Sequence, residues 1–204
     1  FGSGSVQPTD FDGAVVFLTK SKGAIREFIY SDLSQSYNSD ALTILSPHIL
    51  GTPVDMVAQR ESSDQVEGYL YAVNSDGHMP VFMSIRKEKL QGWTRYETNG
   101  NFKNVTNCNR KVYCIVERTI NSSTVTSLEL LDNTYNLDMA SQQTGSSTTT
   151  WSVSHLPNTQ VHVKSGNYSL GQYTTNGSGQ VTLTEAVTSV EIGLNYTPTV
   201  QTLP

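Results

Sequence analysis

The apolar segments of this chain are short, and their length limits the fold more than any other feature of the sequence. Nearly all are four to eight residues long, rich in Val, Ile, Tyr, Phe and Thr, and bounded by Gly, Asn, Asp or Ser. Such segments are typical of β-strands and are too short to cross a bilayer as helices. One candidate helical turn lies in residues 40–50, where Asp40 can cap it and Pro47 ends it. The sequence therefore predicts an all-β fold without membrane insertion.

A weak internal repeat orders these strands. The segments AVVFL at 14–18, YLYAV at 69–73 and VYCIV at 112–116 each have a buried-strand pattern, followed by a polar turn and a second strand. The second strands are IREFIY from Ile25, PVFMSIR from Pro80 and TVTSLEL from Thr124. The copies start 55 and then 43 residues apart, near the period of about 40 to 50 residues of β-propeller blades.

The middle copy is the most complete. The strand patterns VDMVAQ and GWTRYET flank it, which makes four strands in residues 54–98. The dipeptides Asp76-Gly77 and Asn99-Gly100 accept positive φ at low cost, so we expect both to close hairpins. A four-stranded unit of this length has the size of one propeller blade.

The composition changes near residue 132. Residues 133–150 are rich in Ser, Thr, Asn and Gln, which is typical of an exposed linker or edge strand. Five short strands are then predicted, at Trp151 to Ser154, Gln160 to Lys164, Tyr168 to Thr174, Gln180 to Thr184 and Ser189 to Leu194. We therefore expect propeller-like blades, part of a β-propeller or an unclosed stack of similar sheets, in residues 1–132. A small β-sandwich or barrel domain is expected in residues 133–204.

The charge of the chain argues against a protein that grips nucleic acid. It has 13 Lys and Arg against 18 Asp and Glu, a net charge of −5, and Lys164 is the only Lys or Arg after Arg118. Phosphate backbones are held by clustered basic side chains, and no basic stripe occurs in this sequence. The chain begins at Phe1 without Met or a signal segment, so we expect a piece of a longer polypeptide.

Histidine provides two candidate sites. His155 and His162 are close in sequence, but no Cys or second acidic residue stands at metal-ligand spacing, which favours surface histidines over a metal site. His48 precedes Asp55 by seven residues and is a candidate general base. An ordinary loop hydrogen bond is the favoured interpretation of this second pair.

Acidic and aromatic residues provide two more candidates. Asp64 and Glu67 are a possible carboxylate pair for glycoside hydrolysis, although their segment has the composition of a solvated loop. Four aromatic residues are candidates for stacking on a sugar or a base: Tyr69, Tyr71, Trp93 and Tyr96. Because Tyr69 and Tyr71 share strand parity, we favour a place in the sheet interior for them.

A basic cluster follows the second strand of the middle copy. Arg86, Lys87 and Lys89 are offset by Glu88, so we interpret them as a solvated rim and not as a phosphate site. The motifs of nucleotide, metal and nucleophilic chemistry that we sought are missing from the sequence. We therefore expect no catalytic residue, no cofactor-binding residue, no metal site and no cofactor.

The two cysteines flank a short turn-like segment. Cys108 and Cys114 are six residues apart, a spacing that allows either a small hairpin disulfide or two unrelated thiols. We favour free thiols, because two cysteines in a chain of 204 residues do not make a disulfide scaffold.

A series of segments resembles one known family. The segments are FGSGSVQP at the start, then AVVFLTKSKGAIREFIYSD, SDALTILSPHIL, VDMVAQ, YAVNSDG and GWTRYETNG, and finally SHL, VTL and VEIGLNYTPTVQTLP. In this order the chain resembles the tail nozzle proteins of short-tailed bacteriophages (podoviruses), also called tail tubular protein B or packaged-DNA stabilisation proteins. The resemblance covers nearly the whole chain. There are two departures from the family: we expect both ends of the parent protein to lie outside this chain, and GSSTTT before Trp151 is unusually polar.

The resemblance implies a structural role in a virion. Members of this family are β-rich, with a propeller-like body and inserted β domains, and form a six-fold ring at the distal end of the phage tail. The expected function is to continue the DNA conduit, to retain packaged DNA, and to take part in host attachment and genome ejection without catalysis. The implied partners are further copies in a hexamer, a tail adaptor protein, tail fibre proteins, and double-stranded DNA that passes through the lumen without sequence-specific binding.

Two other functions stay open from the residues alone. A carbohydrate- or receptor-binding β domain of a phage tail is suggested by the small C-terminal domain and by Tyr168, Tyr173 and Tyr196. A glycan-degrading propeller enzyme is the least favoured, because its support is limited to the pair Asp64 and Glu67.

Overall fold

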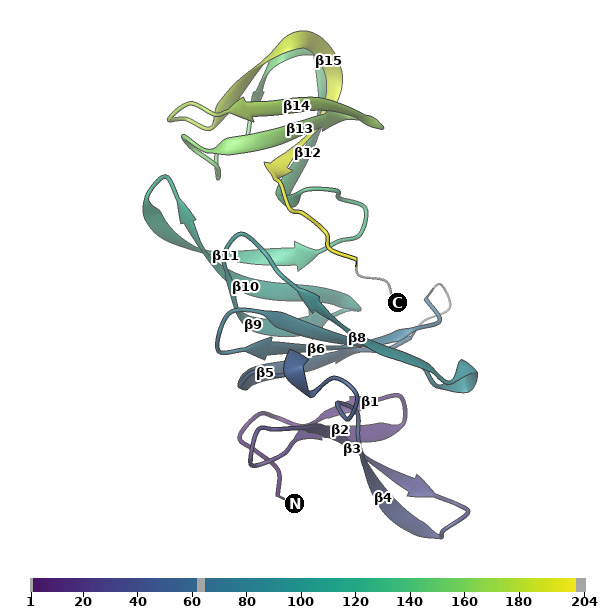
Figure 1. Ribbon diagram of the computed structural model, residues 1–204. Helices are drawn as coiled ribbons and strands as arrows, with labels where there is room; N and C mark the ends of the chain where they lie inside the picture. The colour runs from purple at the N-terminus through teal and green to yellow at the C-terminus, as the bar shows by residue number, and fades with distance from the viewer. Residues whose placement is uncertain (1, 62–64, 201–204) are drawn as a thin grey trace. The chain divides into compact units, whose positions relative to one another are not determined.

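The computed structural model describes residues 2–61 and 65–200, and it confirms the all-β prediction. The strands form four antiparallel sheets, and none of the four closes on itself within the described residues (Figure 1). Two short 3₁₀ turns, η1 (Pro47–Ile49) and η2 (Arg86–Glu88), are the helical elements of these residues. The chain divides into two compact units, residues 1–117 with 126–131 and residues 118–125 with 132–204.

Sheet 1 is a meander of four consecutive strands. They are β1 (Thr9–Phe11), β2 (Ala14–Leu18), β3 (Ile25–Ser31) and β4 (Ser36–Ala41), and neighbours in sequence are neighbours in the sheet. The predicted strands AVVFL and IREFIY are confirmed as β2 and β3. In β2, buried Ala14, Val16 and Leu18 alternate with more exposed residues, as expected when one face of a strand is covered.

The predicted helical turn in residues 40–50 is wrong in its limits. Asp40 does not cap a helix; it lies in β4 and pairs with Glu27 of β3. A hydrogen-bonded turn at Thr43–Ser46 comes directly before Pro47, and Pro47 itself begins η1. The physical reason is that the fixed φ of proline and its missing N–H suit the first position of a helical turn.

Sheet 2 confirms the four strands predicted in residues 54–98. The strands are β5 (Pro53–Gln59), β6 (Gly68–Asn74), β7 (Met79–Ile85) and β8 (Leu90–Tyr96), again in sequence order. The Asp76-Gly77 hairpin is confirmed, with Gly77 at φ +88° between β6 and β7. The central strand β6 is buried on both faces along most of its length, which explains its continuous apolar sequence.

Sheet 3 has three strands, β9 (Asn101–Cys108), β10 (Lys111–Ile120) and β11 (Ser123–Leu131). The hairpin predicted at Asn99-Gly100 is wrong, because these residues connect β8 of sheet 2 to β9 of sheet 3. A turn dipeptide predicts a change in chain direction, but it does not decide whether the two flanking strands pair.

Within the first unit the three sheets stack in sequence order. One core lies between sheets 1 and 2 and contains Phe11, Val16, Leu18, Ile25, Met56, Leu70, Ala72 and Phe82. A second core lies between sheets 2 and 3 and contains Tyr71, Val73, Met79, Val81, Phe102, Val105, Val112, Cys114 and Val116. Sheet 2 is therefore the middle layer, and apolar side chains are buried on both of its faces.

The first strands of neighbouring sheets lie against each other. β1 contacts β5, and β5 contacts β9. The Asp55 carboxylate accepts a hydrogen bond from the Val105 backbone N (3.0 Å), and the Ala58 carbonyl accepts one from Asn107 Nδ2 (3.0 Å). From the first contact to the second, the residue number rises in β5 (55 to 58) and also in β9 (105 to 107), so the two strands run parallel. Sheets 2 and 3 are therefore stacked in the same orientation.

The stacking corrects the register of the sequence repeat. Leu70 and Ala72 face sheet 1, whereas Val112 and Cys114 are the residues of β10 that face sheet 2. In the predicted repeat, Val112 of the third copy is aligned with Tyr69 of the second. In the structure Val112 is equivalent to Leu70, so the predicted alignment is wrong by one residue. Strand periodicity of two makes a shift of one residue exchange the two faces.

The sheet of the second unit contains four strands instead of the five predicted. They are β12 (Asp138–Ser152), β13 (Gln160–Ser165), β14 (Tyr168–Thr174) and β15 (Gln180–Leu194), in the order β12-β15-β13-β14. The polar residues 138–150 belong to β12, which lies at the edge of this sheet. Of the two predicted alternatives, an edge strand or a linker, the edge strand is therefore confirmed for these residues. Residues 151–152 end that strand, and the two segments predicted in residues 180–194 are one strand, β15.

One hydrophobic core supports the second unit. Its buried residues are Ile120, Trp151, Val153, Leu156, Val161, Val163, Val181, Leu183, Val190, Ile192 and Leu194. The described residues of this unit form one four-stranded antiparallel sheet that does not close on itself. The β character of the predicted domain is confirmed, but a sandwich or barrel is not observed in these residues.

Candidate functional site

An exposed apolar face on sheet 1 is the first candidate surface. Val15, Phe28, Tyr30 and Tyr37 are 48%, 42%, 49% and 64% exposed. Val15 pairs with Phe28 across β2 and β3, and Tyr30 pairs with Tyr37 across β3 and β4, so the four side chains share one face. This face is opposite the one that packs on sheet 2.

The aromatic rings on this face contact one another. Phe28 and Tyr37 are stacked, with centroids 4.9 Å apart and an interplanar angle of 7°. Tyr30 meets Tyr37 edge to face at 5.3 Å. Arg26, beside them, donates a hydrogen bond from Nε to Ser39 Oγ at 3.0 Å. Such contacts hold the side chains in place.

Three apolar side chains are also exposed on sheet 3, on a face that carries the Lys103–Glu117 ion pair (3.1 Å) as well. Ile115, Leu128 and Leu130 are 37%, 70% and 38% exposed. Ile115 alternates with Cys114 and Val116, which are buried against sheet 2, so it lies on the opposite face. Ser127 donates a hydrogen bond to the Val116 carbonyl (3.4 Å), which places β11 beside β10 at this level.

The Arg86 cluster is a polar site between two acidic side chains. Arg86 Nε donates to Asp12 Oδ2 (2.9 Å) and Arg86 Nη2 donates to Glu27 Oε2 (2.7 Å). Burial alone would lower the pKa of Arg86, but the two carboxylates outweigh it and raise this pKa. A pocket of about 240 Å³ adjoins the cluster, lined by Glu27, Leu42, Phe82, Ser84, Arg86, Lys89, Leu90 and Gln91.

This arrangement supports the interpretation of the basic cluster as a rim. The charge of Arg86 is already paired with two acids from sheet 1. Lys87 and Lys89 are exposed at the end of η2. A phosphate at Arg86 would have to compete with Asp12 and Glu27, so the cluster is not preorganised for an anion.

The structure does not support His48 and Asp55 as a general base with its carboxylate partner. His48 is exposed in η1, whereas the Asp55 carboxylate accepts hydrogen bonds from the backbone N of Met56 (2.9 Å) and Val105 (3.0 Å). Asp55 therefore joins sheet 2 to sheet 3 from a strand, β5, and its hydrogen bonds are not the favoured loop hydrogen bond to His48.

The candidate pair of the second unit, His155 and His162, also lies apart from acidic clusters. His155 Nε2 is 3.0 Å from the Met139 carbonyl, and His162 lies on β13 with its ring half-buried. In residues 2–61 and 65–200, no three side chains of His, Cys, Asp or Glu gather in a way that could hold a metal ion.

The proposed carboxylate pair cannot be placed as a pair. Asp64 lies outside the described residues, and Glu67 accepts a hydrogen bond from the Tyr69 hydroxyl (3.2 Å). Tyr71 is buried between sheets 2 and 3 and donates to Gln59 Oε1 (3.0 Å), and burial raises the pKa of its hydroxyl. The interior position predicted for Tyr71 is confirmed, with Tyr69 packed beside it.

The remaining aromatic candidates divide between core and surface. Trp93 donates its Nε1 hydrogen to the Leu42 carbonyl (2.9 Å) and packs on Phe82, so it belongs to the core between sheets 1 and 2. Tyr96 stays 39% exposed at the end of β8. In the second unit Tyr168 is 78% and Tyr196 51% exposed, whereas Tyr173 packs partly against the core.

Both cysteines are free, as predicted. Cys108 is exposed at the end of β9, and Cys114 is buried in β10. Burial, with a smaller contribution from Glu129, raises the pKa of the Cys114 thiol to about 12. The buried thiol is therefore a core side chain and not a nucleophile.

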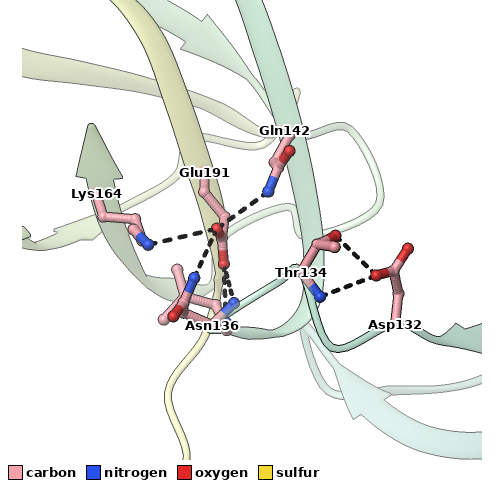
Figure 2. A network of polar contacts seen from close by, with 7 residues as sticks. Asp132, Thr134, Asn136, Gln142, Lys164 and Glu191 are labelled. Atoms are coloured by element: carbon pink, nitrogen blue, oxygen red, sulfur yellow. Dashed lines mark hydrogen bonds and ion pairs between the residues drawn. The ribbon is translucent and has the colours of Figure 1, made fainter. Parts of the chain in front are cut away.

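Glu191 is a buried acid that the sequence analysis missed. It lies on β15 with 4% exposure and accepts hydrogen bonds from the backbone N of Asn136 (2.6 Å) and Leu137 (2.9 Å) and from Gln142 Nε2 (3.3 Å) (Figure 2). Lys164 Nζ lies 3.9 Å from its carboxylate. The contacts fix the segment that enters β12. One acidic residue within the apolar run VEIGL was the available signal.

Sequence comparisons do not extend this description. No family model matches the chain, and no curated protein matches it. Among the described residues, no helix is long and apolar enough to cross a membrane. The candidate function must therefore be argued from the sheets and their exposed faces.

Proposed function

We propose that this chain is a structural component of a short-tailed phage tail, a segment of the tail nozzle that forms the distal DNA conduit. In this role it retains packaged DNA and takes part in host attachment and genome ejection. Its partners are further copies in a six-fold ring, the tail adaptor protein and tail fibre proteins. The place of action is the virion.

The observation that carries the proposal is the stack of three similar sheets, with one hydrophobic core between each pair of neighbours. Sheets 1 and 2 are four-stranded meanders, and sheet 3 repeats their first three strands. Their first strands lie together, as the innermost strands of consecutive propeller blades do. We therefore propose that the sheets are blades of a propeller-like body, in agreement with the ordered family resemblance.

The charge of the chain suits a conduit. DNA that slides through a channel needs a wall that does not hold phosphates, and an acidic, hydroxyl-rich surface repels them. The net charge of −5 and the pairing of Arg86 with Asp12 and Glu27 leave few cations for that contact. We expect no retention of double-stranded DNA by the chain at physiological salt.

Location in the particle tests this function directly. Antibodies raised against the chain should label the distal tail of purified phage particles in immuno-electron microscopy, while antibodies against the capsid label only heads. Mass spectrometry of the same particles should detect its peptides. Particles that contain no such peptide would rule the function out.

The exposed tyrosines of the second unit support one alternative, a carbohydrate- or receptor-binding domain. Tyr168 is 78% exposed at the start of edge strand β14 and offers a ring face to a sugar. A glycan array with the whole chain tests this alternative. Binding that is lost in Tyr168→Ala supports it, and an array without signal removes it.

A further inference from the structure

Three nitrogen-bearing side chains gather around one carboxylate oxygen in the second unit. Oε2 of Glu191 lies 3.9 Å from Lys164 Nζ, 3.5 Å from Asn136 Nδ2 and 3.3 Å from Gln142 Nε2 (Figure 2). The other oxygen, Oε1, accepts hydrogen bonds from the backbone N–H groups of Asn136 and Leu137. An amine and two primary amides therefore meet at one end of a carboxylate whose other end is held by the backbone.

The sheet topology brings these groups together. Lys164 of β13 pairs directly with Glu191 of β15, so their side chains lie on the same face of neighbouring strands. β12 lies on the other side of β15, and Asn136 stands two residues before β12. Glu191, on the strand between them, is 4% exposed and contacts both the lysine and the asparagine.

We propose that Lys164 and Asn136 form an intramolecular isopeptide bond, with Glu191 carrying the proton between them. Glu191 takes a proton from the Lys164 ammonium group, and the free amine attacks Asn136 Cγ. A bond forms between Nζ and Cγ, Glu191 returns its proton to Nδ2, and the bond between Cγ and Nδ2 breaks. Ammonia leaves together with the second proton that Nζ loses, as an ammonium ion, so no oxidant, reductant or co-reactant is needed.

Asn136 is the acyl donor that the contacts favour over Gln142. Both the backbone N and the side-chain Nδ2 of Asn136 donate to Glu191, which restricts the position of its amide group. Gln142 contacts the same carboxylate through its side chain, which has one more rotatable bond. Asn136 is also exposed to solvent, so the ammonia that it releases has a path out.

Proximity is the physical basis of the reaction. Free amines and amides react slowly in water, but groups held in the right geometry within one molecule reach effective concentrations of about 10⁵ M or more. The bond ties the segment before β12 to β13 across the intervening strand β15. It is a property of the folded second unit and does not depend on the proposed function.

The mass of the purified, folded chain is the first test. The loss of one ammonia lowers the mass by about 17 Da. Trypsin gives a second readout, because Lys164 is the only Lys or Arg after Arg118. Trypsin separates residues 119–164 from 165–204 when Lys164 is free, whereas an acylated Lys164 leaves one peptide of residues 119–204. Full mass with complete cleavage after Lys164 overturns the inference.

The trypsin readout also separates this bond from a succinimide. Asparagine before glycine, as at Asn99-Gly100 and Asn176-Gly177, loses ammonia when its side chain cyclises onto the backbone. That reaction leaves Lys164 free, so trypsin still cuts after it. A loss of mass in a chain that is cleaved after Lys164 therefore overturns the inference as well.

Variants assign the roles of the three residues. Lys164→Arg, Asn136→Ala and Glu191→Gln should keep the full mass, whereas Asn136→Asp should lose a water, about 18 Da, because a carboxyl group can be acylated onto the same amine. Glu185→Gln, at an exposed position on the same strand as Glu191, is the matched control and should keep the loss of ammonia. Circular dichroism checks that each variant is folded. A loss that persists in Asn136→Ala would identify another donor, such as Gln142, and would overturn the assignment.

Discussion

Arg118 donates two hydrogen bonds, each 2.8 Å long, to the two carboxylate oxygens of Asp138. The Arg118 side chain is 1% exposed and the Asp138 side chain 18%. The pair joins the tip of the β10–β11 hairpin to the start of β12 inside the second unit. A bidentate contact of this kind satisfies a buried cation that solvent cannot reach.

Removal of the Asp138 charge should destabilise the second unit. Asp138→Asn removes the carboxylate charge that accepts two hydrogen bonds from the buried Arg118 side chain, and we expect a loss of about 3 kcal/mol in the free energy of unfolding in urea. Glu185→Gln is the control, because Glu185 is an exposed acid on β15 of the same unit. The double variant Arg118→Met with Asp138→Leu should recover much of the loss. A loss below about 1 kcal/mol for Asp138→Asn would contradict this role.

Substitution of Glu191 should loosen the segment before β12. Glu191→Gln removes the negative charge that accepts hydrogen bonds from the backbone N–H groups of Asn136 and Leu137. We expect a cost of about 1–3 kcal/mol and faster hydrogen exchange at these two amides. Glu185→Gln, at an exposed position on the same strand, is the matched control. Unchanged exchange at both amides would show that the carboxylate does not hold the segment.

Much of the strand pattern could be predicted because alternation reports which face of a strand is buried. In β2 the buried residues Ala14, Val16 and Leu18 alternate in sequence as they do in the sheet. The exposed face could not be predicted, because Phe28 and Tyr30 in IREFIY have the same apolar pattern as side chains beneath another sheet. A strand with two apolar faces indicates that both faces of its sheet are covered, but the sequence does not show which segment covers each face.

The errors in the strands have local causes. β15 was predicted as two strands, yet residues 185–188 contain no Gly, Pro, Asn or Asp to end the first. Asn99-Gly100 carries a strong turn signal, but the partner of β9 is β10, which comes later in the chain. Strands β8 and β10 both lie next to β9 in the sequence, and local turn signals do not decide which of them pairs with it.

Gly77 should tolerate a side chain less well than another glycine with similar backbone geometry. A Cβ at Gly77 would lie 2.3 Å from Asn101 Oδ1 and 2.7 Å from Asn101 Cβ, whereas a Cβ at Gly13 would meet nothing within 4 Å. Both have positive φ, +88° and +76°. Each alanine should therefore carry the backbone strain of about 1–2 kcal/mol, and only Gly77→Ala the additional clash.

The comparison of the two alanine variants isolates the contact between sheets 2 and 3. The Gly77 carbonyl accepts a hydrogen bond from the Phe102 backbone N (3.0 Å), so the turn cannot move away freely. We expect Gly77→Ala to lower the melting temperature more than Gly13→Ala, and Asn101→Gly to reduce that difference. Equal effects of the two alanines would show that the turn is not constrained by β9.

The two cysteines should differ in reactivity in the native protein. Iodoacetamide at about pH 8 should modify exposed Cys108 and leave buried Cys114 unmodified until the chain unfolds. Burial raises the pKa of the Cys114 thiol from its ordinary value of 9.0 to about 12, so the native state holds this proton more tightly. Its contribution to stability is therefore complete below pH 9 and is lost as pH rises from 9 to about 12. The stability difference between the native sequence and Cys114→Ala should shrink across that window, and a Cys108→Ser chain should take up no label while folded. Rapid labelling of both thiols would mean that β10 is not packed against sheet 2.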